Sequence, residues 1–148
     1  MSHQESRSLV NLFSTLIVTA LYSAYMLQRY PEAAPYSPEL FRFWGAFFLI
    51  LIPVSMVARI ITYIVFHIAH AILTREEPPT ITDERDKSIE LKAQTNSGYL
   101  FIVGFILAMG SLVIDTPPTV MFIILLLSGF GSQVLSELLT FYFYRRGF

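Results

Sequence analysis

Four long apolar runs dominate this sequence and constrain it more than any other feature. They cover residues 9–28, 43–73, 97–114 and 120–142. A helix rises about 1.5 Å per residue, so runs of about 17 to 25 residues cross a hydrocarbon core of about 30 Å. Charged residues make up only 14% of the 148 residues, whereas soluble domains carry about 25%. We therefore predict one domain, residues 1–148, with an all-α fold: an integral membrane bundle of four transmembrane helices.

The first run has two interpretations, a secretory signal peptide or a retained span. Only Arg7 precedes it as a basic residue, and no small-residue cleavage site follows it. Its length is also closer to that of a span, which favours a retained helix. Asn11, Thr15, Thr19 and Ser23 recur every four residues. They share one ridge of that helix, which we expect to face other helices.

The second run is longer than one perpendicular crossing requires, so we expect helix two to tilt strongly or to extend beyond the bilayer. A proline-containing loop, residues 29–42, precedes it. Aromatic residues around this loop are typical of a belt at a membrane surface; they are Tyr22, Tyr25, Tyr30, Tyr36, Phe43 and Trp44.

A charged segment, residues 74–96, separates the second and third runs. Thr82 or Asp83 can cap a new helix there, and the following acids suit the positive end of its dipole. We expect this helix to continue into the third span, so that helices two and three both extend into the cytoplasm. The side follows from the basic residues. One face of the predicted topology has Arg7, Arg75, Arg85, Lys87, Lys92, Arg145 and Arg146, and the other has Arg29 and Arg42. Both termini are therefore predicted to be cytoplasmic.

Small residues line one face of each of the last two helices. They are Gly104, Ala108 and Ser111 in the third run, and Ser128, Gly129, Ser132 and Ser136 in the fourth. Such faces let helix backbones approach closely. We expect a homo-oligomer, or docking on a larger membrane protein, to bury them.

Two charged residues fall inside the predicted spans. Arg59 and Glu137 lie at similar depth, roughly 22 and 25 Å from the outer surface along their helices. Gln133 lies one turn before Glu137. A lone charge at such depth costs a few kcal/mol or more, so each needs a partner, a wet cavity or a route to the interface. Two interpretations of these residues are possible: a structural pair or a functional polar pocket.

The sequence contains no clear pattern of catalytic or metal-binding residues. His67 and His70 are three residues apart and can face one ion, but their spacing matches no metal motif, so we predict no metal site and no cofactor. Gly129-Phe130-Gly131-Ser132 is better explained by packing than as a protease nucleophile. The net charge of −1 offers no basic surface for nucleic acid. We predict that the protein is not an enzyme.

The charged segment and the start of the third span resemble a known family. The stretches Asp83-Glu84-Arg85-Asp86, Ile89-Glu90-Leu91-Lys92-Ala93 and Asn96-Ser97-Gly98-Tyr99 are similar to the hallmark of small four-span prokaryotic membrane proteins whose domain has no known function. The resemblance implies a bacterial or archaeal cytoplasmic (inner) membrane and a special role for residues 83–92. It implies nothing about a substrate.

These observations favour a non-enzymatic interaction protein of the membrane: a regulator, an accessory subunit or an immunity-type protein. Its predicted partner-binding residues are Asp83, Glu84, Arg85, Asp86, Glu90 and Lys92. The alternative is a small oligomeric transporter or channel subunit that uses Arg59, Glu137 and Gln133. A metal-responsive sensor that uses His67 and His70 is a third hypothesis.

Overall fold

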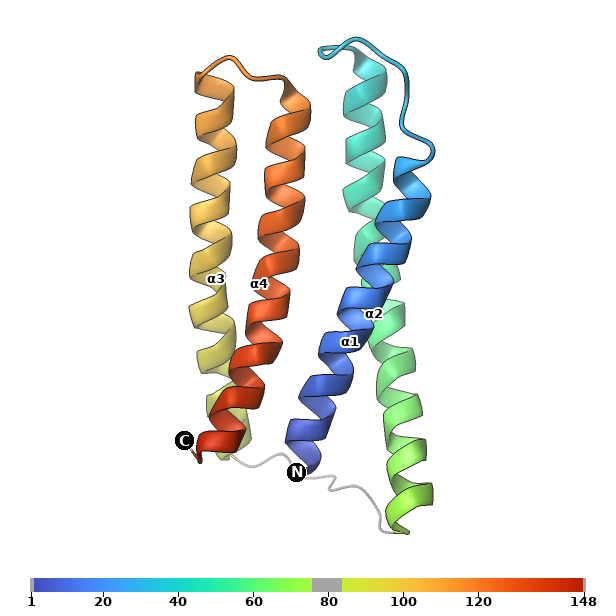
Figure 1. The fold of residues 1–148 in the computed structure, drawn as a ribbon, viewed down its shortest axis with the longest axis vertical. Coiled ribbons are helices and arrows are strands. Elements are labelled where there is room, and N and C mark those ends of the chain that lie inside the picture. The colour runs from blue at the N-terminus through green and yellow to red at the C-terminus, as the bar shows by residue number, and fades with distance from the viewer. Residues whose placement is uncertain (1, 76–83, 148) are drawn as a thin grey trace.

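Four long helices make up the fold. The computed structural model describes residues 2–75 and 84–147. The helices are α1 (His3–Leu27), α2 (Pro38–Thr74), α3 (Glu84–Val113) and α4 (Pro118–Arg146) (Figure 1). Each is long and apolar enough to cross a membrane. The predicted fold class, an all-α bundle of four transmembrane helices, is confirmed.

The helix ends follow local sequence rules. The Ser2 hydroxyl accepts a hydrogen bond from the Glu5 backbone N–H at 3.2 Å and begins α1. Ser37 and the following proline begin α2 in the same manner. Arg75 adopts a left-handed conformation, with φ of 56°, where α2 ends. The predicted caps of α3, Thr82 and Asp83, lie outside the described residues.

Helices α2 and α3 extend past a single crossing. With 37 residues, α2 is about 55 Å long, against a hydrocarbon core of about 30 Å. Helix α3 begins at Glu84 in the charged segment and continues without a break to Val113. The expected continuation of that segment into the third span is therefore present.

The helices form two hairpins, α1 with α2 and α3 with α4, and α4 also packs against α1 (Figure 1). Both chain ends lie at the end of the bundle where α2 finishes and α3 begins. We call this end the termini side and the other end the opposite side. The hairpins are joined mainly through α1 and α4, and this contact positions the polar groups described below.

Small residues let α3 and α4 approach closely. Ser97 and Gly104 of α3 are buried. The Ser132 hydroxyl donates to the Ser97 carbonyl oxygen at 2.8 Å, and a methyl group on Gly104 would overlap the Ser128 side chain. The small-residue faces thus cover one another within one chain. At these positions neither a second copy nor a partner is needed to bury them. The expected homo-oligomer, or docking on a larger membrane protein, stays a prediction.

An aromatic core joins the hairpins on the opposite side. Leu40, Trp44 and Phe47 of α2 are buried. The Trp44 ring stacks on Phe122 of α4, with ring centres 5.4 Å apart, and the Tyr22 hydroxyl of α1 donates to the Phe47 carbonyl oxygen at 2.7 Å. Trp44 is only 1% exposed, so it packs inside the bundle at this end. The aromatic belt at the membrane surface stays a prediction.

Candidate functional site

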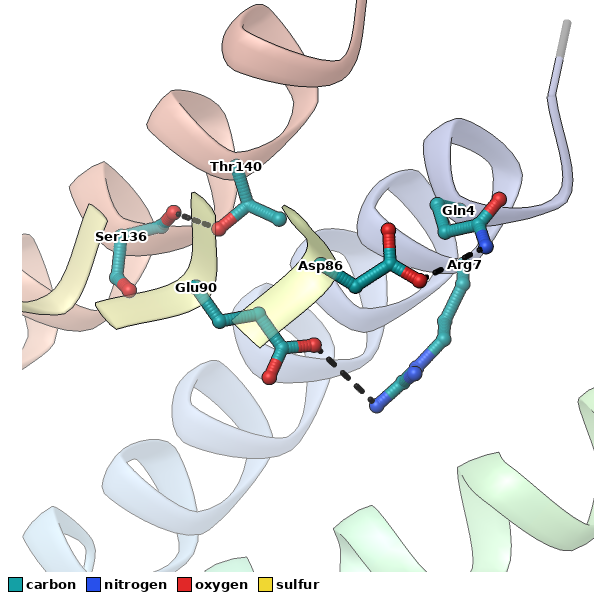
Figure 2. Close-up of polar contacts among 6 residues, drawn as sticks. All are labelled: Gln4, Arg7, Asp86, Glu90, Ser136 and Thr140. Carbon is teal, nitrogen blue, oxygen red and sulfur yellow. Dashed lines mark hydrogen bonds and ion pairs between the residues drawn. The ribbon is translucent and has the colours of Figure 1, made fainter. Parts of the chain in front are cut away.

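Polar side chains connect α1 to the start of α3 on the termini side (Figure 2). Gln4 of α1 donates its side-chain N–H to the Asp86 carboxylate at 3.4 Å. One turn along, an Arg7 guanidinium nitrogen lies 4.0 Å from a Glu90 carboxylate oxygen, and both side chains are 42% exposed. Partly exposed polar contacts of this kind contribute little stability each. They therefore join the two hairpins weakly.

The first turns of α3 have two chemically different faces. Ile89 is fully buried, and Asp86 and Glu90 beside it are half-buried and contact α1. Glu84 and Lys87 are exposed on other faces of the same turns. The helical repeat produces this division, because residues three and four apart share a face.

The other predicted partner-binding residues lie around these two faces. Arg85 and Lys92 are exposed, and the Lys92 ammonium lies 5.6 Å from the centre of the Phe143 ring. Asp83 lies outside the described residues. The predicted partner-binding set is therefore divided: some members contact α1, and others face outward.

Two cavities lie between the hairpins near this region; the lining of the smaller is mainly polar, and that of the larger is mixed. Their volumes are about 250 and 300 Å³. The smaller is lined by Gln4, Arg7, Ser8, Asn11, Arg59, Glu90, Gln94, Ser136, Glu137, Thr140 and Tyr144. Four residues also line the larger, namely Arg7, Asn11, Arg59 and Glu137. The Thr140 hydroxyl donates its hydrogen bond within α4, to the Ser136 carbonyl oxygen at 2.8 Å (Figure 2).

Arg59 and Glu137 meet at these two cavities, as their similar depth on α2 and α4 predicts. Both line each cavity. Glu137 is half-buried and Arg59 is exposed. An ion pair joins Arg7 to Glu90, whereas none joins Arg59 to Glu137, both of which lie in the part of the chain that the structure describes. They share a polar space without forming a closed pair.

A third, larger cavity of about 520 Å³ lies deeper in the bundle. Most of its lining is apolar, and Arg59 and Gln133 border it together. Its other lining residues are Thr19, Phe48, Leu51, Ile52, Ser55, Met56, Phe101, Leu125, Leu126, Gly129 and Phe130. Arg59 thus lines all three cavities: the two smaller ones on the termini side and this mainly apolar one. Sequence reasoning placed Arg59 and Gln133 at depth but did not foresee this cavity.

Three histidine rings gather where α1 begins and α2 ends. The His3 ring centre lies 4.5 Å from that of His70 and 5.9 Å from that of His67. In residues 2–75 and 84–147, no three His, Asp or Glu side chains form a group that could hold a metal ion. The sequence analysis missed His3. An antiparallel hairpin places the start of α1 beside the end of α2. This topology could have indicated from the sequence that His3 lies near His67 and His70.

The fold and these cavities define a multi-pass membrane protein with a polar region between two helical hairpins. No family model, curated protein or solved structure matches the chain. The resemblance seen in residues 83–99 stays a prediction.

Proposed function

We propose that this protein is a non-enzymatic interaction protein of the membrane, a regulator or accessory subunit that binds a partner through the exposed face of the start of α3. The proposed location is the cytoplasmic membrane of a prokaryote, with both termini in the cytoplasm. The distribution of basic residues supports this orientation.

The two-faced start of α3 is the observation that carries the proposal. Glu84, Lys87 and Leu91 are exposed, and Leu91 keeps 66% of its surface accessible. Asp86 and Glu90, on the inward side, contact α1 of the other hairpin. A partner that binds the outer face touches the same turns of α3 whose inner face contacts α1. Binding can therefore shift the spacing of the hairpins, if the partner prefers one spacing over another.

The exposed face suits a partner with mixed charge and a small apolar contact. It combines an acid, Glu84, and a base, Lys87, with the apolar Leu91. Exposed polar contacts give specificity and association rate more than affinity. We propose either a larger membrane protein or a second copy of this chain as the partner.

The test compares two double variants that alter different faces of the same helix. Glu84→Ala with Lys87→Ala changes the exposed face, and Asp86→Ala with Glu90→Ala changes the inward face. Each protein is purified in mild detergent from membranes of its host, and the co-purifying proteins are identified. We expect the first variant to lose the partner of the wild type while it keeps its thermal stability. An unchanged set of partners would contradict the proposal.

A second candidate function is a small transporter or channel subunit. It is favoured by one observation: Arg59 and Glu137 line the same polar cavities without pairing. Buried ionisable groups in such cavities mark solute or proton routes in many membrane proteins. The packed rings of Trp44 and Phe122 lie on the opposite side, so transport requires these rings to separate.

Proteoliposome flux distinguishes the two functions. A transporter should move protons or small ions across liposomes, and Glu137→Gln should abolish that flux. An interaction protein should show no flux above empty liposomes, with either side chain at position 137.

A further inference from the structure

The large cavity combines an apolar body with one charged end. Arg59 is the only ionisable residue among the described residues that line it. Arg59 and Gln133 lie at its termini-side end, whereas Phe48 and Leu125 lie toward the opposite side. Phe48 precedes Arg59 by eleven residues in α2, or about 16 Å. The cavity is therefore polarised along the membrane normal.

The volume and the opening of this cavity suit a ligand that enters from the bilayer. A volume of about 520 Å³ lies within the range of about 300 to 1,000 Å³ that is common for small-molecule sites. Ile52 and Met56 line it and are each 60% exposed on the outer surface of α2. In a membrane that surface faces lipid, so the cavity opens sideways into the hydrocarbon.

The charge at its end selects the chemistry of the ligand. No carboxylate of the described chain lines this cavity, and Arg59 does not form an ion pair with Glu137. A guanidinium in this position can bind the oxygens of a phosphate in a bidentate manner. Gln133, on the facing helix, adds an amide donor. The site thus offers a cation and a donor next to an apolar channel.

From this arrangement we propose that the large cavity binds one acyl chain of an anionic phospholipid from the termini-side leaflet, with the phosphate of that lipid at Arg59. A lipid in this leaflet has its headgroup toward the termini side and its chains toward the bilayer centre. The cavity has the same polarity, from Arg59 and Gln133 to Phe48 and Leu125. The bound lipid fills the space between α2 and α4, and its phosphate neutralises the charge of Arg59, which is costly within a membrane when it is left without a partner.

The experiment counts lipids bound to the full chain by native mass spectrometry. The protein is purified in mild detergent and titrated with phosphatidylglycerol or, separately, with phosphatidylcholine. Arg59→Gln removes the charge of the site. Arg42→Gln, on the same helix but near its other end, is the matched control for the loss of one positive charge. Gly129→Leu places a larger side chain in the apolar part of the cavity, which Gly129 lines.

We expect the wild type and Arg42→Gln to bind one phosphatidylglycerol in preference to phosphatidylcholine. In Arg59→Gln, binding should weaken by about tenfold, as expected for loss of a charge-assisted contact, and Arg59→Lys should restore part of it. Gly129→Leu should abolish it. If Gly129→Leu does not fold, the comparison of Arg59→Gln with Arg42→Gln still decides.

Three results would overturn the proposal. Equal binding by Arg59→Gln and Arg42→Gln would mean that the lipid lies elsewhere on the surface. Equal affinity for phosphatidylglycerol and phosphatidylcholine would mean that Arg59 does not select an anionic headgroup. Co-purification of a neutral isoprenoid or quinone in place of a phospholipid would assign the cavity to a different ligand.

Discussion

Arg7 of α1 and Glu90 of α3 lie 4.0 Å apart and form an ion pair between the two helical hairpins. Each side chain is 42% exposed, so water screens the pair. Beside it, Gln4 donates to Asp86 at 3.4 Å. The start of α3 is therefore held against α1 by contacts that are weak enough for a binding partner to displace.

The first prediction concerns the strength of this pair. A double-mutant cycle of Arg7→Gln and Glu90→Gln should give a coupling energy between zero and about 1 kcal/mol, because both groups are partly solvated. Thermal unfolding in detergent, followed by circular dichroism, measures it. A coupling well above about 2 kcal/mol would indicate a buried, rigid connection between the hairpins.

The second prediction concerns Arg59 and Glu137. Since they line the same two cavities without forming an ion pair, a double-mutant cycle of Arg59→Gln and Glu137→Gln, measured by thermal unfolding in detergent, should give a modest coupling energy of about 0.5 to 1 kcal/mol. Glu137→Gln alone should leave stability unchanged or raise it slightly, because it removes a charge from the interior of the membrane. Strong coupling between the two substitutions would mean that the side chains pair in the folded protein.

The third prediction tests the close approach of α3 and α4. Gly104→Ala should destabilise the protein by about 1 to 3 kcal/mol, because the added methyl group overlaps the Ser128 side chain. Gly110→Ala on the same helix is the matched control, since nothing lies within 4 Å of its added carbon. It should be neutral or slightly stabilising. Adding Ser128→Gly to Gly104→Ala should recover most of the loss; equal effects at the two glycines would contradict this packing.

The fourth prediction concerns the aromatic core on the opposite side. Trp44→Ala should cost about 3 to 5 kcal/mol, because it leaves a cavity beneath Phe122. Trp44→Phe should cost much less. It keeps a ring against Phe122 and removes an indole N–H that has no hydrogen-bond partner. Trp44 is the only tryptophan, so its fluorescence in the wild type should be blue-shifted and resistant to aqueous quenchers; ready quenching would place it at the surface.

The sequence was sufficient for the helices but not for their contacts. Apolar run length predicts the four spans, and the acids after Thr82 predict a helix that continues into the membrane. Hydropathy does not indicate which helices pack together. The small faces at Gly104 and Ser128 have the same pattern whether they meet in one chain or between two copies. For the same reason, the aromatic residues around the first loop did not indicate that Trp44 is buried between the helices.

The candidate site was partly predictable for a related reason. Distance along each helix places Arg59 and Glu137 at one depth, and both line the same cavities. Depth does not give rotation about the helix axis, so it could not distinguish a closed pair from a shared cavity. The contacts of Asp86 and Glu90 with α1 depend on how the two hairpins meet. His3 joins His67 and His70 for a similar reason, through the hairpin of α1 and α2.

Site-specific photocrosslinking in native membranes tests the central claim most directly, namely that the exposed face of the start of α3 binds a partner. A photoreactive amino acid replaces Ser88, which is exposed beside Glu84 and Leu91, so that the charged residues of the proposed binding face are kept. A control protein carries it at Asp115, which is exposed on the opposite side. We predict one discrete crosslinked species from position 88 and none from position 115. A species of twice the mass of the chain would identify a second copy, and any other mass a different protein. No crosslink at position 88 above that at position 115 would contradict the proposed function.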